Sequence, residues 1–430
     1  MIVYWSTTTS VRSCLNPTTS NIVNRSTLKI GMLPAVLLVG LLLIHLSYGL
    51  RIPRVPHPDE QWTFNMLLDN VNKLIWTTIL KRDNHPPLYY LVSKGWIELT
   101  GATIAGLRWL SFLFTGITLC FIAWVYRRRP RFEMAVVLLL IGTNPLLSYY
   151  SATVRPYSMV VLLATIMTFS AAELRGRHSI KANHSGEASD CLVATELDSR
   201  RASSGGQRNW YFLYYGSALL LGLTHYFGTL YVLLATCLDF LSRRIERSPW
   251  NGMLLLLLIF CWPVLQVLSG SVGDQASHNS WVNVFPLIST INNFLAGVFP
   301  LLIISRTPQL GFGLVLALVL LLIALRPVLK GAGKLPILRR GWLAWLLAND
   351  SAFLVVLVTA VVAAGCVADA LLPFTTPYYF LVCLPAVIIL LGRLISASNR
   401  DIFSGSLSVF LTLAIVALQI QLAHQRLSLP

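Results

Sequence analysis

Charged residues are scarce in this sequence. Only 12% of its 430 residues are Asp, Glu, Lys or Arg, whereas soluble domains carry roughly 25%. Apolar residues make up 55% of the chain, and its mean hydropathy is +0.68. This scarcity excludes an ordinary soluble domain. Because the apolar residues fall in runs near the length needed to cross a bilayer, we expect an all-α polytopic membrane protein.

Acidic residues are scarcer than basic ones. The chain has 17 Asp and Glu against 33 Lys and Arg, which gives a net charge of +16. Such an excess also occurs in nucleic-acid-binding proteins. Here, however, the cations cluster in short loops between apolar runs, where the positive-inside rule and anionic lipid headgroups account for them. We therefore expect membrane lipids as partners and no nucleic acid.

The sequence has no cysteine framework and no internal repeat. Its seven cysteines are scattered, most of them inside apolar runs, and no spacing indicates a metal site or a set of disulfides. They are typical of small core hydrophobes. The absence of an apparent repeat disfavours an inverted-repeat transporter.

Eleven apolar runs are expected to cross the membrane. The polar segment 1–29 is expected in the cytoplasm, and the run after it is an uncleaved first span because no small-residue cleavage site follows. With this orientation every arginine-rich loop faces the cytoplasm. We expect one transmembrane domain over 30–430 with about 11 helices, within a range of 10–13. The spans are 30–50, 104–126, 132–150, 156–174, 209–223, 225–241, 251–269, 309–326, 350–372, 378–396 and 403–422.

Four segments are not simple spans. The outer loop 51–85 has apolar residues at near-helical spacing, which predicts amphipathic helix on the membrane surface. The segment 86–100 is apolar but short and charged, so we expect a short or partly inserted helix. The segment 289–304 is expected to be an interfacial helix on the outer side. The polar loop 175–208 is expected to be cytoplasmic, disordered and not catalytic.

The first acidic residues of the chain are the adjacent Asp59 and Glu60, and five Lys or Arg precede them. A carboxylate at the membrane surface loses hydration and lies near lipid phosphates, so it is costly without a role. Either the pair does chemistry, or it pairs with a cation such as Arg51 or Arg54.

Further polar side chains gather at the same outer face of the expected bundle. A guanidinium there suits bidentate phosphate binding, although it also suits snorkelling to lipid phosphates. Buried histidines are also found as satisfied core residues, and outward tyrosines form aromatic belts. No spacing requires a metal, so a divalent ion at His57, Asp59, Glu60 and His85 is not favoured. The candidates for donor or phosphate binding are His85, Lys94, Arg155, Tyr157, His225, Tyr378 and Tyr379, with Asp369 as a further candidate.

The order of these motifs resembles the GT-C glycosyltransferases that use lipid-linked sugars. This superfamily includes protein O-mannosyltransferases, aminoarabinose transferases and a branch named for the Rhizobium lipopolysaccharide core transferases, which is the most similar. The likeness covers roughly 30–240 well and the last third loosely. It rests on Asp59-Glu60, His85-Pro86-Pro87-Leu88-Tyr89-Tyr90, Arg108, Tyr149-Tyr150-Ser151, Arg155-Pro156-Tyr157, Thr224-His225-Tyr226-Phe227-Gly228, Pro377-Tyr378-Tyr379 and Leu384-Pro385-Ala386.

The resemblance implies a GT-C-type bundle and transfer of a hexose or pentose from a polyprenyl-phosphate donor. The acceptor would be a hydroxyl or amine on a glycan, lipid or protein, with inversion at the anomeric carbon. The acceptor must lose a proton, so a carboxylate is needed, and Asp59 is the expected base. Glu60 either shares that role or orients the acceptor or the surface helix. Arg155, with His85 or Lys94, would stabilise the leaving phosphate, which requires no cofactor or metal.

Two other functions compete with this one. A transporter or lipid flippase would carry ionisable residues at mid-membrane, where the expected spans have almost none. A catalytically degenerate family member is the third interpretation, because Ala152 and Thr153 stand where the family often has Gln-Glu, and Tyr378 where it has Arg. The favoured function places the active site on the extracytoplasmic side of the cell membrane.

Overall fold

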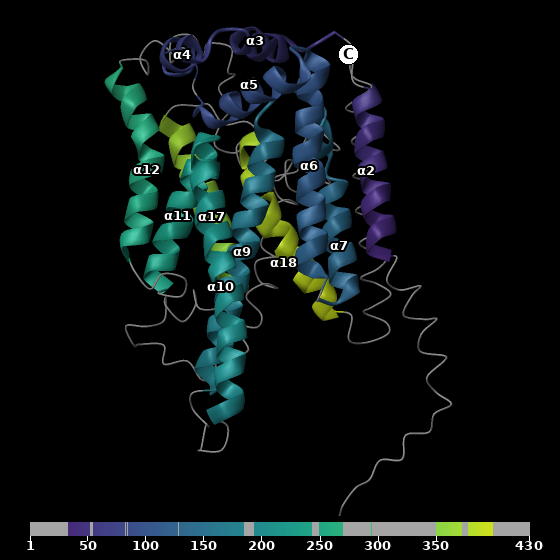
Figure 1. Ribbon diagram of the computed structural model, residues 1–430, viewed down its shortest axis with the longest axis vertical. Helices are drawn as coiled ribbons and strands as arrows, with labels where there is room; N and C mark the ends of the chain where they lie inside the picture. The colour runs from purple at the N-terminus through teal and green to yellow at the C-terminus, as the bar shows by residue number, and fades with distance from the viewer. Residues whose placement is uncertain are drawn as a thin grey trace, which may run out of the picture.

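The computed structural model describes ten parts of the chain, and in all of them the secondary structure is helix or turn, without a strand. The prediction of an all-α protein is confirmed. Figure 1 shows long helices running side by side, with shorter helices across one end. Three predictions lie outside the described residues: the spans 309–326 and 403–422, and the helix 289–304 apart from Phe294. The described residues are 33–51, 55–81, 83, 85–127, 129–184, 193–242, 249–269, 294, 350–371 and 377–398.

The long helices follow the predicted spans. Four of them, α6, α9, α12 and α17, contain stretches long and apolar enough to cross a membrane, and shorter apolar stretches occur in three more places. The chain is a polytopic membrane protein. The bounds are Leu33–Arg51 (α2), Ile104–Tyr126 (α6), Arg131–Gly142 (α7), Tyr157–His184 (α9), Val193–Gly222 (α10), Tyr226–Ser242 (α11), Pro249–Leu268 (α12), Asp350–Leu371 (α17) and Leu384–Ser398 (α18).

Three predicted segments differ from the structure. The predicted span 378–396 begins as a 3-10 helix, Pro377–Cys383, before α18. The span 132–150 is not one helix, because it breaks after α7 and restarts as α8 (Pro145–Tyr150). The Asn144 side chain accepts a hydrogen bond of 3.0 Å from the Leu147 N–H, and a proline is favoured at a first helical position. The prediction of a disordered loop over 175–208 was wrong for its two ends, because α9 continues to His184 and α10 begins at Val193.

Short helices lie across the end of the bundle where α2 ends and α6 begins (Figure 1). They are α3 (Pro58–Leu67), α4 (Val71–Lys73), a π-helix (Leu74–Ile79) and α5 (Leu88–Thr100). Helix is present in both predicted segments, 51–85 and 86–100, in the former as consecutive short pieces. We call this the α3–α5 end. The opposite end carries Arg127, Arg129 and Arg131, between α6 and α7, and we call it the arginine end.

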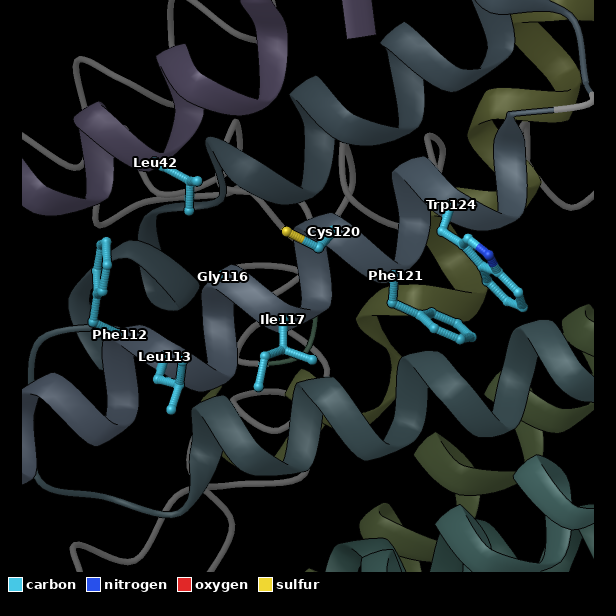
Figure 2. A pocket seen from close by; sticks show the side chains of 8 residues that line it. All are labelled: Leu42, Phe112, Leu113, Gly116, Ile117, Cys120, Phe121 and Trp124. Carbon is cyan, nitrogen blue, oxygen red and sulfur yellow. The ribbon is translucent and has the colours of Figure 1, made fainter. Parts of the chain in front are cut away.

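A shallow apolar groove of about 530 Å³ lies along α6 on the side that faces α2. Its floor includes Gly116 and Cys120, Leu42 of α2 forms one wall, and the rings of Phe112 and Trp124 lie at its two ends (Figure 2). Several of these side chains are exposed in the protein alone, as lipid-facing residues are.

A buried ion pair ties four helices together towards the arginine end. Arg175 of α9 pairs with Asp239 of α11, and both side chains are 1% exposed. The Tyr214 hydroxyl of α10 donates a 2.6 Å hydrogen bond to the other Asp239 oxygen. The Arg175 guanidinium also lies 3.5 Å from the ring centroid of Phe353 in α17. Arg175 is 18 residues after Tyr157, which puts it about 27 Å along the helix from the α3–α5 end.

We expect Asp239→Asn to lower the free energy of unfolding by about 3–5 kcal/mol, because Arg175 would stay buried without a counter-charge. The double variant Arg175→Met, Asp239→Leu should recover most of this loss, because it removes both charges. Thermal unfolding in detergent measures the effect. Lys73→Ala is the control, because Lys73 is 57% exposed in its pair with Asp69 and exposed pairs contribute about 0–1 kcal/mol. A single variant as stable as the parent would contradict the expectation.

Candidate active site

The loop between α8 and α9, residues 151–156, is held from several sides at the α3–α5 end. The Ser111 hydroxyl of α6 donates a 2.6 Å hydrogen bond to the Thr153 carbonyl. His45 of α2 lies 3.0 Å from the Ser151 hydroxyl. The Ser158 hydroxyl donates to the Tyr150 carbonyl at 2.6 Å. These buried contacts fix the backbone that carries the next residues of the loop, including the candidate Arg155.

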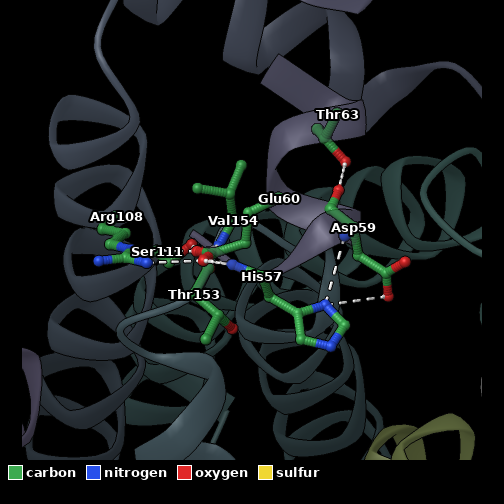
Figure 3. Close-up of polar contacts among 8 residues, drawn as sticks. All are labelled: His57, Asp59, Glu60, Thr63, Arg108, Ser111, Thr153 and Val154. Carbon is green, nitrogen blue, oxygen red and sulfur yellow. Dashed lines mark hydrogen bonds and ion pairs between the residues drawn. The ribbon is translucent and has the colours of Figure 1, made fainter. Parts of the chain in front are cut away.

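Glu60 joins three separate segments of the chain. Its carboxylate accepts hydrogen bonds from Arg108 of α6 at 3.0 Å (Nε) and 2.6 Å (Nη2). It also accepts from the Val154 N–H at 2.9 Å and from the His57 N–H at 3.1 Å, the latter as part of the capping box that starts α3. We call this set of contacts the Glu60 junction (Figure 3).

The carboxyl of Glu60 is ionised within this junction. Burial alone would raise its pKa, but the hydrogen bonds and charge of Arg108, with the Val154 and His57 N–H groups, outweigh burial and lower the pKa below the ordinary glutamate value. Both of its oxygens already accept hydrogen bonds from the protein. This arrangement suits a residue that orders backbone and leaves little capacity to take a proton from a substrate.

Asp59 points the other way from Glu60 (Figure 3). Its side chain is 45% exposed and forms an ion pair with Arg155, which is 17% exposed. The His57 Nδ1 atom lies 3.7 Å from the Asp59 carboxylate. The structure thus brings together the two ionic residues that the sequence placed at one face, and it leaves the carboxylate accessible.

Five predicted residues meet beside this pair in a cluster of aromatic rings, which we call the His–Tyr cluster. The His85 and His225 ring centroids are 5.1 Å apart, and Tyr379 lies 5.0 Å from His225. Tyr157 lies 5.6 Å from His225 and 4.7 Å from Tyr378. The rings come from the starts of α9 and α11, the segment before α5, and the 3-10 helix Pro377–Cys383.

Asp83 is a member of the site that the sequence reasoning missed. Its carboxylate accepts hydrogen bonds from the Tyr90 hydroxyl at 2.9 Å and the His85 N–H at 2.7 Å. One oxygen also lies 2.8 Å from His85 Nδ1. Gln266 of α12 donates to the Asp83 carbonyl at 3.0 Å. An acid two residues before a histidine was visible in the sequence, and Asp83 fixes the orientation of the His85 ring.

His225 is neutral and presents one defined hydrogen-bond donor. The Phe227 N–H donates to its Nδ1 atom at 3.1 Å, so the ring proton of the neutral form is on Nε2. This Nε2 atom is buried and has no hydrogen-bond partner among the described residues. Burial, together with the nearby His85 and Arg155, keeps the pKa of His225 well below the ordinary histidine value.

Lys94 is a predicted site residue that does not join this cluster. The Lys94 ammonium donates a 2.9 Å hydrogen bond to the Leu67 carbonyl and lies 3.8 Å from Glu98, so it anchors the end of α3 on α5. Asp369 falls in the last turn of α17, and its side chain lies outside the part that the structure describes. Among the described residues, no group of three or more His, Cys, Asp or Glu side chains could hold a metal ion.

Solved structures similar to the chain include two of ArnT from Cupriavidus metallidurans. The crystal structure bound to undecaprenyl phosphate has a TM-score of 0.49 and 16% identity over 89% of this chain. The apo structure has a TM-score of 0.43 and 16% identity over 91% of this chain. The chain spans 63% and 72% of those two proteins. No protein-family model and no curated protein matches the chain.

We expect the apparent melting temperature in detergent to fall as the pH drops below about 6.5, the ordinary histidine pKa. Below that pH the unfolded chain binds a proton at His225 that the folded protein does not, so unfolding is favoured, by up to about 1.4 kcal/mol per pH unit. His225→Gln should flatten this dependence. Thermal unfolding between pH 5.5 and 8 measures it, and an identical pH dependence in the parent and the variant would contradict the buried neutral state.

Proposed function

We propose that the chain is an integral membrane glycosyltransferase. It moves a sugar from a polyprenyl-phosphate donor to an acceptor hydroxyl or amine, with Asp59 as general base. The observation that carries the proposal is the Asp59–Arg155 pair, in which an accessible carboxylate lies against a guanidinium at one end of an apolar bundle. A base and a phosphate-binding cation are the two groups that this reaction needs.

The transfer is a single displacement. The acceptor oxygen or nitrogen attacks the anomeric carbon, and its proton passes to the Asp59 carboxylate. The bond from the anomeric carbon to the phosphate oxygen breaks, and its electron pair leaves with polyprenyl phosphate. Attack from the face opposite the leaving group inverts the anomeric carbon. Arg155 stabilises the charge that grows on the leaving phosphate, and the reaction requires neither a cofactor nor a metal.

The histidines and tyrosines surround the phosphate and sugar. The Nε2–H donor of neutral His225 is free to contact an oxygen of the donor substrate. His85, oriented by Asp83, and the hydroxyls of Tyr157, Tyr378 and Tyr379 supply further hydrogen bonds. Glu60 is a positioning residue in this mechanism, because its junction with Arg108 and Val154 fixes both the start of α3 and the loop that carries Arg155.

We infer the orientation from the basic loop at the arginine end. The arginine end carries Arg127, Arg129 and Arg131, and basic loops are retained on the cytoplasmic side. We therefore assign the α3–α5 end, and with it the active site, to the extracytoplasmic face of the cell membrane. A carrier lipid with its phosphate at that interface would present the sugar at the level of Asp59.

We expect Asp59→Asn to lower sugar transfer by about 10²–10⁴-fold, the contribution of a general base, with little change in thermal stability. The assay is sugar transfer in membranes supplied with lipid-linked sugar, beside thermal unfolding of the purified variant. Glu60→Gln is the matched comparison, because it removes the neighbouring carboxylate. It should destabilise the protein by about 3–5 kcal/mol, since the Glu60 carboxylate is only 3% exposed in its ion pair whereas that of Asp59 is 45% exposed. Full transfer by the Asp59→Asn variant would exclude Asp59 as the base.

We expect Arg155→Gln to lower the rate constant of transfer about 10²–10³-fold, the loss typical of one transition-state donor. Arg155→Lys should retain part of this rate and raise KM for the lipid-linked donor, because lysine keeps the charge without the two-pronged contact. Steady-state kinetics with varied donor separates the two effects. Lys73→Gln, which removes an exposed cation at the same end, should change neither value. Equal losses of transfer rate in all three variants would mean that the overall surface charge, and not a contact of Arg155 with phosphate, accounts for the effect.

A further inference from the structure

Cations lie beyond both ends of the apolar groove along α6, and the one beyond Phe112, Arg108, is paired with Glu60. The side chains that line it are apolar apart from the Cys120 thiol, from Phe112 down to Trp124 (Figure 2). Beyond Trp124, the Arg127 guanidinium lies 4.7 Å from the Trp124 ring centroid. The far end of the groove thus carries a cation over an indole, at the arginine end of the bundle.

The groove has the length of one lipid leaflet. Phe112 and Trp124 are 12 residues apart on one helix, which corresponds to about 18 Å. Half of a typical hydrocarbon core is about 15 Å. A tryptophan is most stable at the boundary between hydrocarbon and headgroups, so Trp124 marks the interface of the leaflet at the arginine end. The groove then extends from that interface to about the middle of the bilayer.

The Trp124 ring is held in place, so the mouth of the groove has a fixed shape. It lies 5.7 Å from the ring of Phe121 and 5.5 Å from the ring of Trp210 in α10. Arg127 also donates a 3.3 Å hydrogen bond to the Trp124 carbonyl. Its side chain remains exposed, and the described residues place no carboxylate in an ion pair with it, whereas Arg129 nearby pairs with Glu173.

Gly116 keeps the middle of the groove open. A Cβ atom at this position would come within 3.5 Å of the Leu42 side chain of α2, so any larger residue would occupy the space between the two helices. Cys120, one turn further along α6, is an exposed thiol on the same floor.

We propose that this groove binds an anionic phospholipid of the leaflet at the arginine end. One acyl chain lies along Gly116 and Cys120, and the phosphate pairs with Arg127. Complementary charge and the length of a single leaflet favour this occupant. The tail of the carrier lipid is a different occupant, because the carrier phosphate is assigned to Arg155 at the opposite end. The proposal does not depend on the glycosyltransferase activity.

The test follows alkylation of cysteines in the purified full-length chain in detergent. N-ethylmaleimide is added with increasing phosphatidylglycerol or phosphatidylcholine, and labelling of each cysteine is measured by peptide mass spectrometry. Phosphatidylglycerol should slow labelling of Cys120 at about fivefold lower concentration than phosphatidylcholine, the preference expected from one basic residue at an anionic lipid. Cys237 and Cys261 are also exposed and serve as internal controls whose labelling should not show this preference.

Variants separate the proposed site from general effects of lipid. Arg127→Gln should remove the preference for phosphatidylglycerol, whereas Arg131→Gln, which removes an exposed cation at the same end, should retain it. Gly116→Leu should leave Cys120 insensitive to either lipid, and size-exclusion chromatography checks that it folds. Equal protection of all three cysteines, or equal losses in the two arginine variants, would overturn the proposal. Protection of Cys120 by polyprenyl phosphate and not by phosphatidylglycerol would instead assign the groove to the carrier lipid.

Discussion

The geometry of the candidate site depends on one buried carboxylate. Glu60 accepts hydrogen bonds from α6, from the loop after α8 and from the start of its own helix. These segments are far apart in sequence, and the carboxylate is 3% exposed. A buried charge is tolerated only when it is paired and its lone pairs are filled. Because Glu60 must keep these partners, it holds the start of α3 against the loop after α8. Asp59 and Arg155 lie on these two segments, so their relative position depends on Glu60.

The two adjacent carboxylates have different environments because they leave the helix in different directions. Glu60 is buried among hydrogen-bond donors, whereas Asp59 points away from it (Figure 3) and is 45% exposed. A general base must be accessible to the substrate. The proposed base Asp59 meets this condition, whereas the buried Glu60 does not. The different environments of the two carboxylates thus arise from their positions on the helix.

Much of this arrangement was predictable from the sequence, because the number of crossings between two motifs decides which motifs share a membrane face. That reasoning placed Asp59, Arg155 and the His–Tyr cluster at one end. It could not assign Glu60 to Arg108, because a pairing across 48 residues depends on how α3 lies on α6. The break at Asn144-Pro145 could have been recognised from helix-start chemistry. The segment 175–208 was expected to be disordered because it is polar. Polar residues can nevertheless have high helix propensity, and both ends of this segment are helical.

Arg155 has two competing partners in the proposed reaction, and the competition explains why its pairing with Asp59 is compatible with catalysis. In the structure the guanidinium neutralises the carboxylate, which keeps both charges stable at an apolar boundary. A phosphate offers the same guanidinium a bidentate acceptor with more charge. Once Arg155 turns to the phosphate, the Asp59 carboxylate is released from its ion pair and can contact the acceptor. Donor binding would thus prepare the base, so that the carboxylate becomes reactive only when a leaving group is in place.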